Sequence, residues 1–286
     1  MNSRIVLIAA LSLCTATAFA ADHSFDRTLN TTSSPAVTIF TGSGSIHLHP
    51  GSDSQIHISA QLRAEKNLFS SVSDTESRMQ QIASNPPIRQ AGGDVTIGER
   101  GNNSLYRNIS IEYDITLPRG SAINANTGSG EIVIQDVGNY VKAGTGSGNV
   151  QAHGVHGHVS LETGSGGITL DEAGGGDETR VQTGSGSIHL SGITGALQAS
   201  TGSGGITAGG NPTADWRLQT GSGSIQLALG SSAHFSLNAN TGSGSIHIEQ
   251  PILMQGSLNR QRVTGSVNGG GPTVRAETGS GSIQIR

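Results

Sequence analysis

The four residues Thr-Gly-Ser-Gly constrain this chain more than any other feature, because they occur nine times in it. The copies begin at Thr41, Thr127, Thr145, Thr163, Thr183, Thr201, Thr220, Thr241 and Thr278. From Thr127 to Thr241, successive copies are 18 to 21 residues apart. A catalytic loop is needed once, whereas a unit of about 20 residues that recurs at a fixed period is typical of a solenoid. The repeat therefore predicts an architecture of stacked coils.

Strands are expected on both sides of each copy. Two and four residues before the threonine the side chains are mostly apolar, as Ala199 and Leu197 are before Thr201, and the residue between them is polar. Five and seven residues after the threonine the alternation returns, as in Ile206 and Ala208. A period of two is that of a strand with one buried face. The Thr-Gly-Ser-Gly motif is then the corner between two strands.

We expect the residues of this corner to have structural roles. Glycine allows either a positive φ angle or a close approach between stacked backbones. Threonine and serine can hydrogen-bond to local backbone groups. The corner residues singled out are Thr127, Gly128, Gly130, Thr145, Gly146, Gly148, Thr183, Gly184 and Gly186.

A third apolar position completes one turn of a three-sided or flattened coil. It lies in the connections and is occupied by Val137, Val155, Ala173 and Ile193. A left-handed coil would show an apolar period of six residues, which this spacing does not, so we favour the right-handed form. The sequence predicts an all-β fold, a single-stranded parallel β-helix (β-solenoid) of about 18–21 residues per coil with a helix-containing N-terminal insertion.

The first 20 residues have the pattern of a secretory signal peptide. Arg4 precedes an apolar run over residues 5–13, and Ala18-Phe19-Ala20 has the small residues of a cleavage site. Cleavage removes the one cysteine, Cys14, and with it any disulfide or thiol chemistry. It leaves 15 basic against 20 acidic side chains, a net charge of −5, which does not favour nucleic acid as a partner. We expect no transmembrane segment in the mature chain, and an exported protein that is periplasmic, secreted or on the cell surface.

An interruption separates the first coil, residues 21–61, from the main repeats, residues 111–286. In this insertion, residues 62–110, the apolar spacing of Ala64, Leu68, Val72, Met79 and Ile82 predicts a helix that ends before Pro86 and Pro87. Strands are expected at 94–97 and 109–117, with the turn at 101–103. The insertion is interpreted as a cap over the open end of the solenoid, with a lid that gates a ligand as the alternative. The last strand, 283–286, has no evident cap, so that end is available for edge or end-to-end self-association.

Few residues offer chemistry. His153, His156 and His158 are close in sequence and are weak candidates for a surface metal site, as are Asp171 and Asp177. His47, His189 and His247 share one outward position, but the two later histidines are expected three coils apart, about 14 Å, too far for one metal. The outward positions offer almost no carboxylates and no aromatic platform, so we expect no catalytic residues, no cofactor and no enzyme activity.

Several of these motifs resemble one known family. The residues are Leu117-Pro118 followed by Ile123-Asn124-Ala125 before Thr127, the serial Gly-Ser-Gly-x-Ile-x-Leu, and an ending with Val263-Thr264-Gly265-Ser266-Val267. Over roughly residues 35–286 they are similar to the bacterial "putative adhesin" family, a domain of unknown function made of β-solenoid repeats. The resemblance implies the fold and carries no agreed catalytic or binding residues.

Three functions follow as expectations, in decreasing order. The first is an exported, non-enzymatic, adhesin-like β-solenoid that acts as a binding or scaffold surface. The alternative is a periplasmic, envelope-associated structural or stress factor, and a carbohydrate-active β-helix enzyme ranks below both. The partner is unknown, with an envelope glycan or protein as the expected class.

Overall fold

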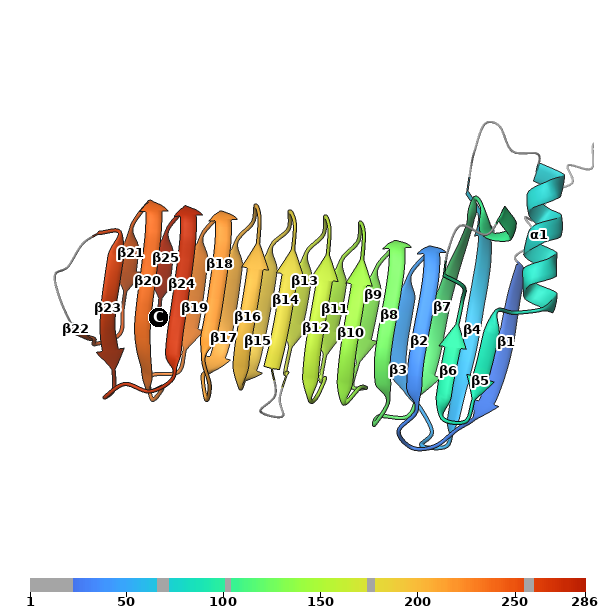
Figure 1. Cartoon of the computed structure of the whole chain (residues 1–286), viewed down its shortest axis with the longest axis horizontal. Helices are drawn as coiled ribbons and strands as arrows, with labels where there is room; N and C mark the ends of the chain where they lie inside the picture. Colours follow the sequence, from blue (N-terminus) through green and yellow to red (C-terminus); the bar gives the residue numbers. More distant parts are fainter. Residues whose placement is uncertain (1–22, 66–71, 101–103, 174–177, 255–259) are drawn as a thin grey trace, which may run out of the picture.

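Two long β-sheets face each other along the molecule and form a flattened coil (Figure 1). The computed structural model describes residues 23–65, 72–100, 104–173, 178–254 and 260–286. In spatial order the first sheet contains β1 (His23–Asn30), β4 (Gln55–Ala64), β7 (Ile109–Leu117), β3 (Ile46–Pro50), β9 (Ile132–Gln135), β11 (Val150–His153), β13 (Ile168–Asp171), β15 (Ile188–Thr194), β17 (Ile206–Asn211), β19 (Ile225–Leu229), β25 (Ile283–Ile285) and β21 (Ile246–Ile248).

The second sheet lies opposite the first. In spatial order it contains β22 (Leu253–Met254), β23 (Arg262–Val267), β20 (Phe235–Ser243), β24 (Thr273–Ser280), β18 (Trp216–Ser222), β16 (Ala196–Thr201), β14 (Glu178–Thr183), β12 (His158–Thr163), β10 (Tyr140–Thr145), β8 (Ala122–Ser129), β2 (Ala36–Ser43), β6 (Asp94–Ile97) and β5 (Ile88–Ala91). The helices are α1 (Val72–Ser84) and the short 3₁₀ helix η1 (Ser104–Tyr106).

The repeats stack in register as parallel strands. Each threonine of the phrase pairs with the threonine of the next coil, as Thr145 does with Thr163. The apolar position five residues later forms a continuous buried column, with Ile168, Ile188 and Ile206 each fully buried. No coil has an inner face large enough to fold alone, so the stack shares one core. The predicted β-solenoid is confirmed in its flattened, two-sheet form, and its right-handed sense stays a prediction.

The order of the coils differs from the order of the sequence at one end. The β24–β25 coil comes last in the chain, yet β24 lies between β18 and β20, and β25 lies between β19 and β21 (Figure 1). The expectation that the strand at 283–286 leaves a free edge is therefore wrong, because β25 has a partner strand on each side. The outer strands at this end are β21 in the first sheet and β22 in the second.

The opposite end carries a cap of different construction. Strands β1, β4 and β7 pair antiparallel, and β5 and β6 form an antiparallel pair that extends the second sheet beyond β2. Helix α1 contacts β1 and β4 at this end (Figure 1). Within the segment expected to form the first coil, β2 and β3 belong to the parallel stack, whereas β1 and β4 belong to the antiparallel cap.

Two predicted strands of the insertion are confirmed, since β6 spans 94–97 and β7 spans 109–117. The described helix spans Val72–Ser84 and ends before Pro86, as predicted. Ala64, expected to be helical, ends β4, where it pairs with Ile109. Leu68 and the turn at 101–103 lie outside the described residues. Across the described ranges, no helix has the length and apolar character needed to cross a membrane.

Candidate functional site

A hydrogen-bond ladder joins the repeated corners. In the stacked copies, the threonine Oγ1 donates to the carbonyl oxygen of the second glycine in a neighbouring corner, at 2.8–3.0 Å. Thr145 donates to Gly130 in this way and Thr183 donates to Gly166. These threonines are buried. The hydroxyls were expected to bond to local backbone, and the structure shows instead that they link one coil to the next.

The corner glycines are needed because backbones approach closely there. A Cβ on Gly128 would lie 2.4 Å from the Gly42 carbonyl oxygen, and one on Gly166 would lie 1.8 Å from the Gly148 carbonyl oxygen. Heavy atoms cannot approach so closely, and a backbone carbonyl in a ladder cannot move aside. Of the two reasons offered for these glycines, close approach applies inside the stack, and Gly130, Gly146, Gly148, Gly184 and Gly186 have contacts of the same kind.

At the first corner the two glycines differ: a Cβ on Gly44 would lie 2.1 Å from the Ile111 carbonyl oxygen of β7, whereas Gly42 lacks such a neighbour. Strand β2 pairs with β8 up to Ser43, but its pairing with β6 stops at Ile39. A Cβ on Gly42 would meet no atom within 4 Å. Strand β6 ends at Ile97, before the place where another Thr-Gly-Ser-Gly corner would stack. The sequence repeat therefore ends in an open position.

A pocket of about 400 Å³ occupies this position. Its described lining comes from the end of β2, the segment after β6, the start of β7 and the corner of β8, and comprises Phe40, Thr41, Gly42, Ser43, Gly98, Glu99, Arg100, Tyr106, Arg107, Asn108, Ile109, Ile111, Tyr113, Asn126, Thr127 and Gly128. This volume is within the range of small-molecule sites. We call it the corner pocket.

Tyr113 contributes a buried hydroxyl to the lining of the corner pocket. Its side chain is fully buried on β7 and its ring packs edge-on against Phe25, with centroids 6.3 Å apart. Its Oη has no hydrogen-bond partner among the described residues. Burial, and secondarily the neighbouring Tyr106, raises the pKa of the Tyr113 phenol far above its usual range, so the group is a hydrogen-bond donor at neutral pH.

Charged side chains gather at the rim of the corner pocket. The Arg100 guanidinium lies 4.2 Å from the centroid of the Phe40 ring, a cation–π contact. Glu99 forms an ion pair with Arg89 at 3.1 Å. Burial and Glu99 raise the pKa of the Tyr106 phenol, while Arg89 opposes them, so this phenol is also protonated at neutral pH. The rim therefore presents hydrogen-bond donors beside aromatic surface.

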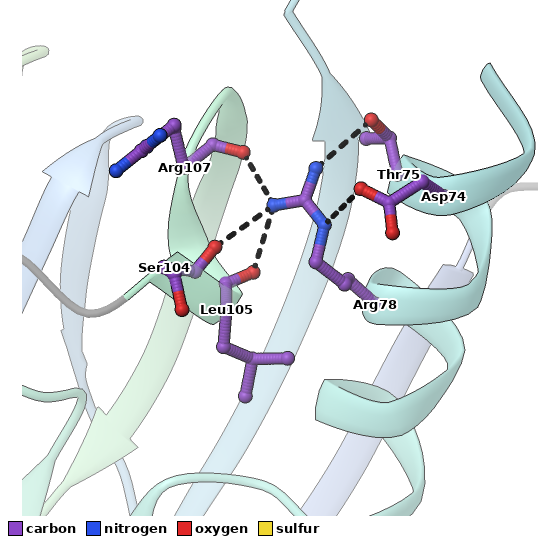
Figure 2. Close-up of polar contacts among 6 residues, drawn as sticks. All are labelled: Asp74, Thr75, Arg78, Ser104, Leu105 and Arg107. Carbon is purple, nitrogen blue, oxygen red and sulfur yellow. Dashed lines mark hydrogen bonds and ion pairs between the residues drawn. The ribbon is translucent and has the colours of Figure 1, made fainter. Parts of the chain in front are cut away.

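Arg78 on α1 holds the segment around η1, which forms one wall of the corner pocket. Figure 2 shows its guanidinium among backbone carbonyls of the segment at η1. Its Nη1 donates to the carbonyl oxygens of Ser104, Leu105 and Arg107 at 3.1, 3.2 and 2.7 Å. Its Nε pairs with the Asp74 carboxylate at 3.1 Å, and its Nη2 donates to Thr75 Oγ1 at 3.0 Å. The side chain of Arg107 extends away from Arg78 in this view.

The weak metal candidates are not brought together. His153 ends β11 in the first sheet and pairs with Glu172 at 3.7 Å, whereas His158 begins β12 in the second sheet and stacks on Tyr140 with centroids 5.3 Å apart. His156 lies in the connection between these strands. Asp171 accepts a hydrogen bond from Ser191, and Asp177 lies outside the described residues. Among the residues whose structure is described, no cluster of three or more histidine or acidic side chains is placed to hold a metal.

The outward histidine column needs one correction. His189 on β15 and His247 on β21 were expected three coils apart, but β17, β19 and β25 all lie between them. At the usual strand spacing they are separated by about 19 Å. The third member, His47, pairs in register with Asp114 of β7 and Val133 of β9. One metal ion cannot bind two of these three histidines at once.

The sequence did not indicate the corner pocket. Tyr113 was placed in a strand and Arg78 fell within a predicted helix, but neither was singled out. The one available signal was the 86-residue gap between Thr41 and Thr127, the longest between successive copies. It shows that the cap segment after the first corner contains no Thr-Gly-Ser-Gly motif.

Comparisons with known proteins give the following matches. Similar solved structures include a putative adhesin from Bacteroides fragilis (13% identity, covering 92% of this chain and 97% of that chain, TM-score 0.40) and one from Parabacteroides distasonis (11%, 92% and 97%, 0.37). A third is a putative cell adhesion protein from Clostridium sporogenes (13%, 92% and 98%, 0.28). No curated protein matches the chain. The model of one family, Toastrack DUF4097, matches residues 34–286.

Proposed function

This chain belongs to the Toastrack DUF4097 family, and from that premise we propose that it is an exported, non-enzymatic β-solenoid whose outward side chains form an adhesin-like binding or scaffold surface. In this proposal residues 1–20 are the signal peptide, residues 62–110 form the cap together with β1 and β4, and the remaining coils of residues 21–61 and 111–286 carry the surface. The Thr-Gly-Ser-Gly corners hold the coils in place.

The observation that carries the proposal is a polar column along the second sheet. One outward position in register across eight strands holds Asn124, Lys142, Ser160, Arg180, Gln198, Arg217, Arg275 and Asn238. None of these side chains is buried. Backbone pairing fixes their spacing at about 4.8 Å per strand. Such a row offers many equivalent contacts on a rigid surface, which suits an extended or repetitive partner.

The insertion of the last coil also shapes this column. Arg217 and Arg275, 58 residues apart in sequence, become direct neighbours in the register. With Lys142 and Arg180 they make four cationic positions in the column, and Arg180 and Arg275 each pair with a nearby glutamate. Because glutamates neutralise two of the four cations, the column favours an extended polar partner over a uniformly anionic one.

A substitution series tests the distributed surface. Lys142, Arg180, Arg217 and Arg275 would be changed to glutamine singly and together, and binding to purified envelope sacculi measured by co-sedimentation. We expect graded losses, small for each single change and large for the fourfold variant. A matched fourfold variant on the first sheet, with Gln151, Thr169, Thr207 and Gln226 changed to alanine, controls for general damage. Complete loss from one substitution would contradict a distributed surface.

Location tests the exported, adhesin-like part of the proposal. Intact cells would be treated with protease and the chain followed by antibody, with and without opening of the outer membrane. Cleavage on intact cells is the expected result. Protection until the membrane is opened would refute adhesion and favour the periplasmic, envelope-associated alternative. New reducing or unsaturated ends on polysaccharides incubated with the pure protein would refute the non-enzymatic assignment.

A further inference from the structure

We propose that the corner pocket binds the carboxylate of a small organic acid, with Arg100 and Arg107 as the cationic contacts and Tyr113 Oη as a buried donor. The site is separate from the outward columns, so it stands or falls independently of the distributed surface.

The position of the corner pocket shows that it is a built feature of the fold. In the stacked corners the first glycine packs on the glycine of a neighbouring corner too closely to admit a methyl group, as Gly164 does on Gly146. At Gly42, the equivalent residue of the first corner, the backbone faces open space. The cap continues β2 with β6 and β3 with β7, and Ile111 of β7 covers Gly44, but Gly42 stays uncovered. A small ligand can therefore rest against a backbone that a neighbouring coil covers elsewhere.

A buried hydroxyl and two cationic side chains in the lining of the pocket are hydrogen-bond donors. Tyr113 Oη is a protonated hydroxyl that is fully buried and has no acceptor within the described part of the chain. A buried polar group without a partner is costly, which indicates that an acceptor completes it when the site is filled. Arg100 and Arg107 add two guanidinium groups to the lining, while the one lining carboxylate, Glu99, is already paired with Arg89. The unbalanced charge of the lining is positive and favours an anion.

The remaining surface favours an organic anion over an inorganic one. Phe40, Tyr106, Ile109 and Ile111 contribute aromatic and aliphatic surface to the same lining. A singly charged carboxylate costs less to desolvate in such a site than a doubly charged phosphate. Guanidinium groups also match a carboxylate in planar, two-point hydrogen bonding. The volume of about 400 Å³ accommodates a skeleton of monosaccharide or amino-acid size.

Part of the cationic rim is held in position before a ligand arrives. The Arg100 guanidinium lies over the Phe40 ring, and Arg78 holds the backbone of Arg107 through its carbonyl oxygen at 2.7 Å. Ordering these groups in advance lowers the entropy cost of binding.

Calorimetric titration of the full chain provides the test. The probes are galacturonate as a sugar acid, N-acetylglutamate as an amino-acid-derived carboxylate, glucose as a neutral sugar, and inorganic phosphate, each up to about 10 mM. We expect one or both carboxylates to bind with a dissociation constant in the micromolar to millimolar range, and the stronger of the two identifies the source. Glucose and phosphate should bind at least tenfold more weakly. Equal binding of all four probes, tighter binding of phosphate, or binding of neither carboxylate would overturn the proposal.

Four variants assign the contacts. Arg100→Gln and Arg107→Gln should each weaken carboxylate binding about 10- to 100-fold, as expected for loss of a charge-assisted hydrogen bond, and Tyr113→Phe about tenfold. Gly42→Leu projects a side chain into the open position and should abolish binding without lowering the melting temperature. Gly230→Leu, at another glycine with no atom within 4 Å, is its control, and the exposed Arg63→Gln is the control for the arginines. Unchanged affinity in both Gly42→Leu and Arg100→Gln would refute the site.

Discussion

The corner at Thr163 and the corner at Thr41 have the same four residues and different surroundings. At Thr163 both glycines pack against neighbouring carbonyls and the hydroxyl bonds to Gly148 of the next coil. At Thr41 the hydroxyl bonds to Ser43 and Ile111, and Gly42 faces the corner pocket. The difference shows that the contacts of each motif residue depend on the neighbouring coil and not on the Thr-Gly-Ser-Gly sequence alone. Inside the stack both glycines of the motif are packed, whereas at the capped end Gly44 is packed on Ile111 and Gly42 is available for contact.

The largest expected effect comes from adding one methyl group inside the stack. Gly164→Ala would place a Cβ 2.5 Å from the Gly146 carbonyl oxygen, and we expect it to lower the free energy of unfolding by about 3 kcal/mol, the cost of overpacking a site that cannot relax. Gly42→Ala at the equivalent place of the first corner should change it by less than about 0.5 kcal/mol. Thermal and urea unfolding measure both changes. Equal losses of unfolding free energy would contradict the difference between the stacked corner and the first corner.

The next effect lies within the cap. Arg78→Gln removes the guanidinium that holds three carbonyl oxygens between residues 104 and 107, and charged hydrogen bonds of this kind contribute about 2 kcal/mol. We expect faster hydrogen exchange in residues 104–109 and unchanged exchange in β12 to β18. Arg63→Gln, which breaks an exposed pair with Glu112, is the control and should cost less than about 1 kcal/mol. Faster exchange throughout the stack would mean that cap and coils unfold as one unit.

A smaller effect tests the hydroxyl ladder. Thr163→Val keeps the size of the side chain and removes the donor to Gly148, so we expect a loss of about 1 kcal/mol in unfolding free energy. Thr41→Val, at a half-buried side chain with no stacked corner beyond it, should cost less than half as much. Denaturant unfolding distinguishes these values, and a larger loss at Thr41 would show that the ladder matters most at its end.

The smallest effect at neutral pH is expected for Tyr113→Phe, because the hydroxyl that it removes has no partner among the described residues. Above pH 10 the two proteins should diverge. The folded state holds the Tyr113 proton more tightly than the unfolded state, whose phenol titrates near 10.0. The resulting stability is therefore complete below pH 10 and declines as the pH rises above it.

Urea unfolding between pH 8 and pH 12 measures this divergence. Wild type should lose more stability over the alkaline range than Tyr113→Phe. Tyr140→Phe, at a tyrosine 45% exposed on the coil stack, is the control. Parallel pH profiles for wild type and Tyr113→Phe would contradict the effect of burial on this phenol.

The local alternation of apolar and polar residues predicts the coils, but it does not predict the order in which they stack. The alternation around each threonine identifies buried positions such as Leu197 and Ile206, because burial of one strand face depends on residues two apart. The neighbours of each coil depend on register between distant segments, and nearly identical phrases make many registers similar in sequence. For that reason the place of β24 between β18 and β20 could not be inferred from the repeat.

The corner pocket was unpredictable for a related reason. Tyr113 alternates correctly in its strand and looks like an ordinary core residue, and only the packing of the cap shows that its hydroxyl has no acceptor. Arg78 looks like an exposed helical residue until α1 is placed beside η1. Ala64 fits a helical spacing because it lies four residues before Leu68, but it also continues the two-residue alternation of β4, to which it belongs.

The place of the β24–β25 coil has a consequence for the order of assembly. A chain that is made or exported from its N-terminus presents β20 and β21 before β24 and β25 exist. Until then β20 and β21 lack the inner neighbours that connect them to β18 and β19. The coils up to β19 can add one at a time, but this last portion must close around residues 273–285 in a single step. Folding of a growing chain should thus pause at β19 and finish only when Ile285 is available.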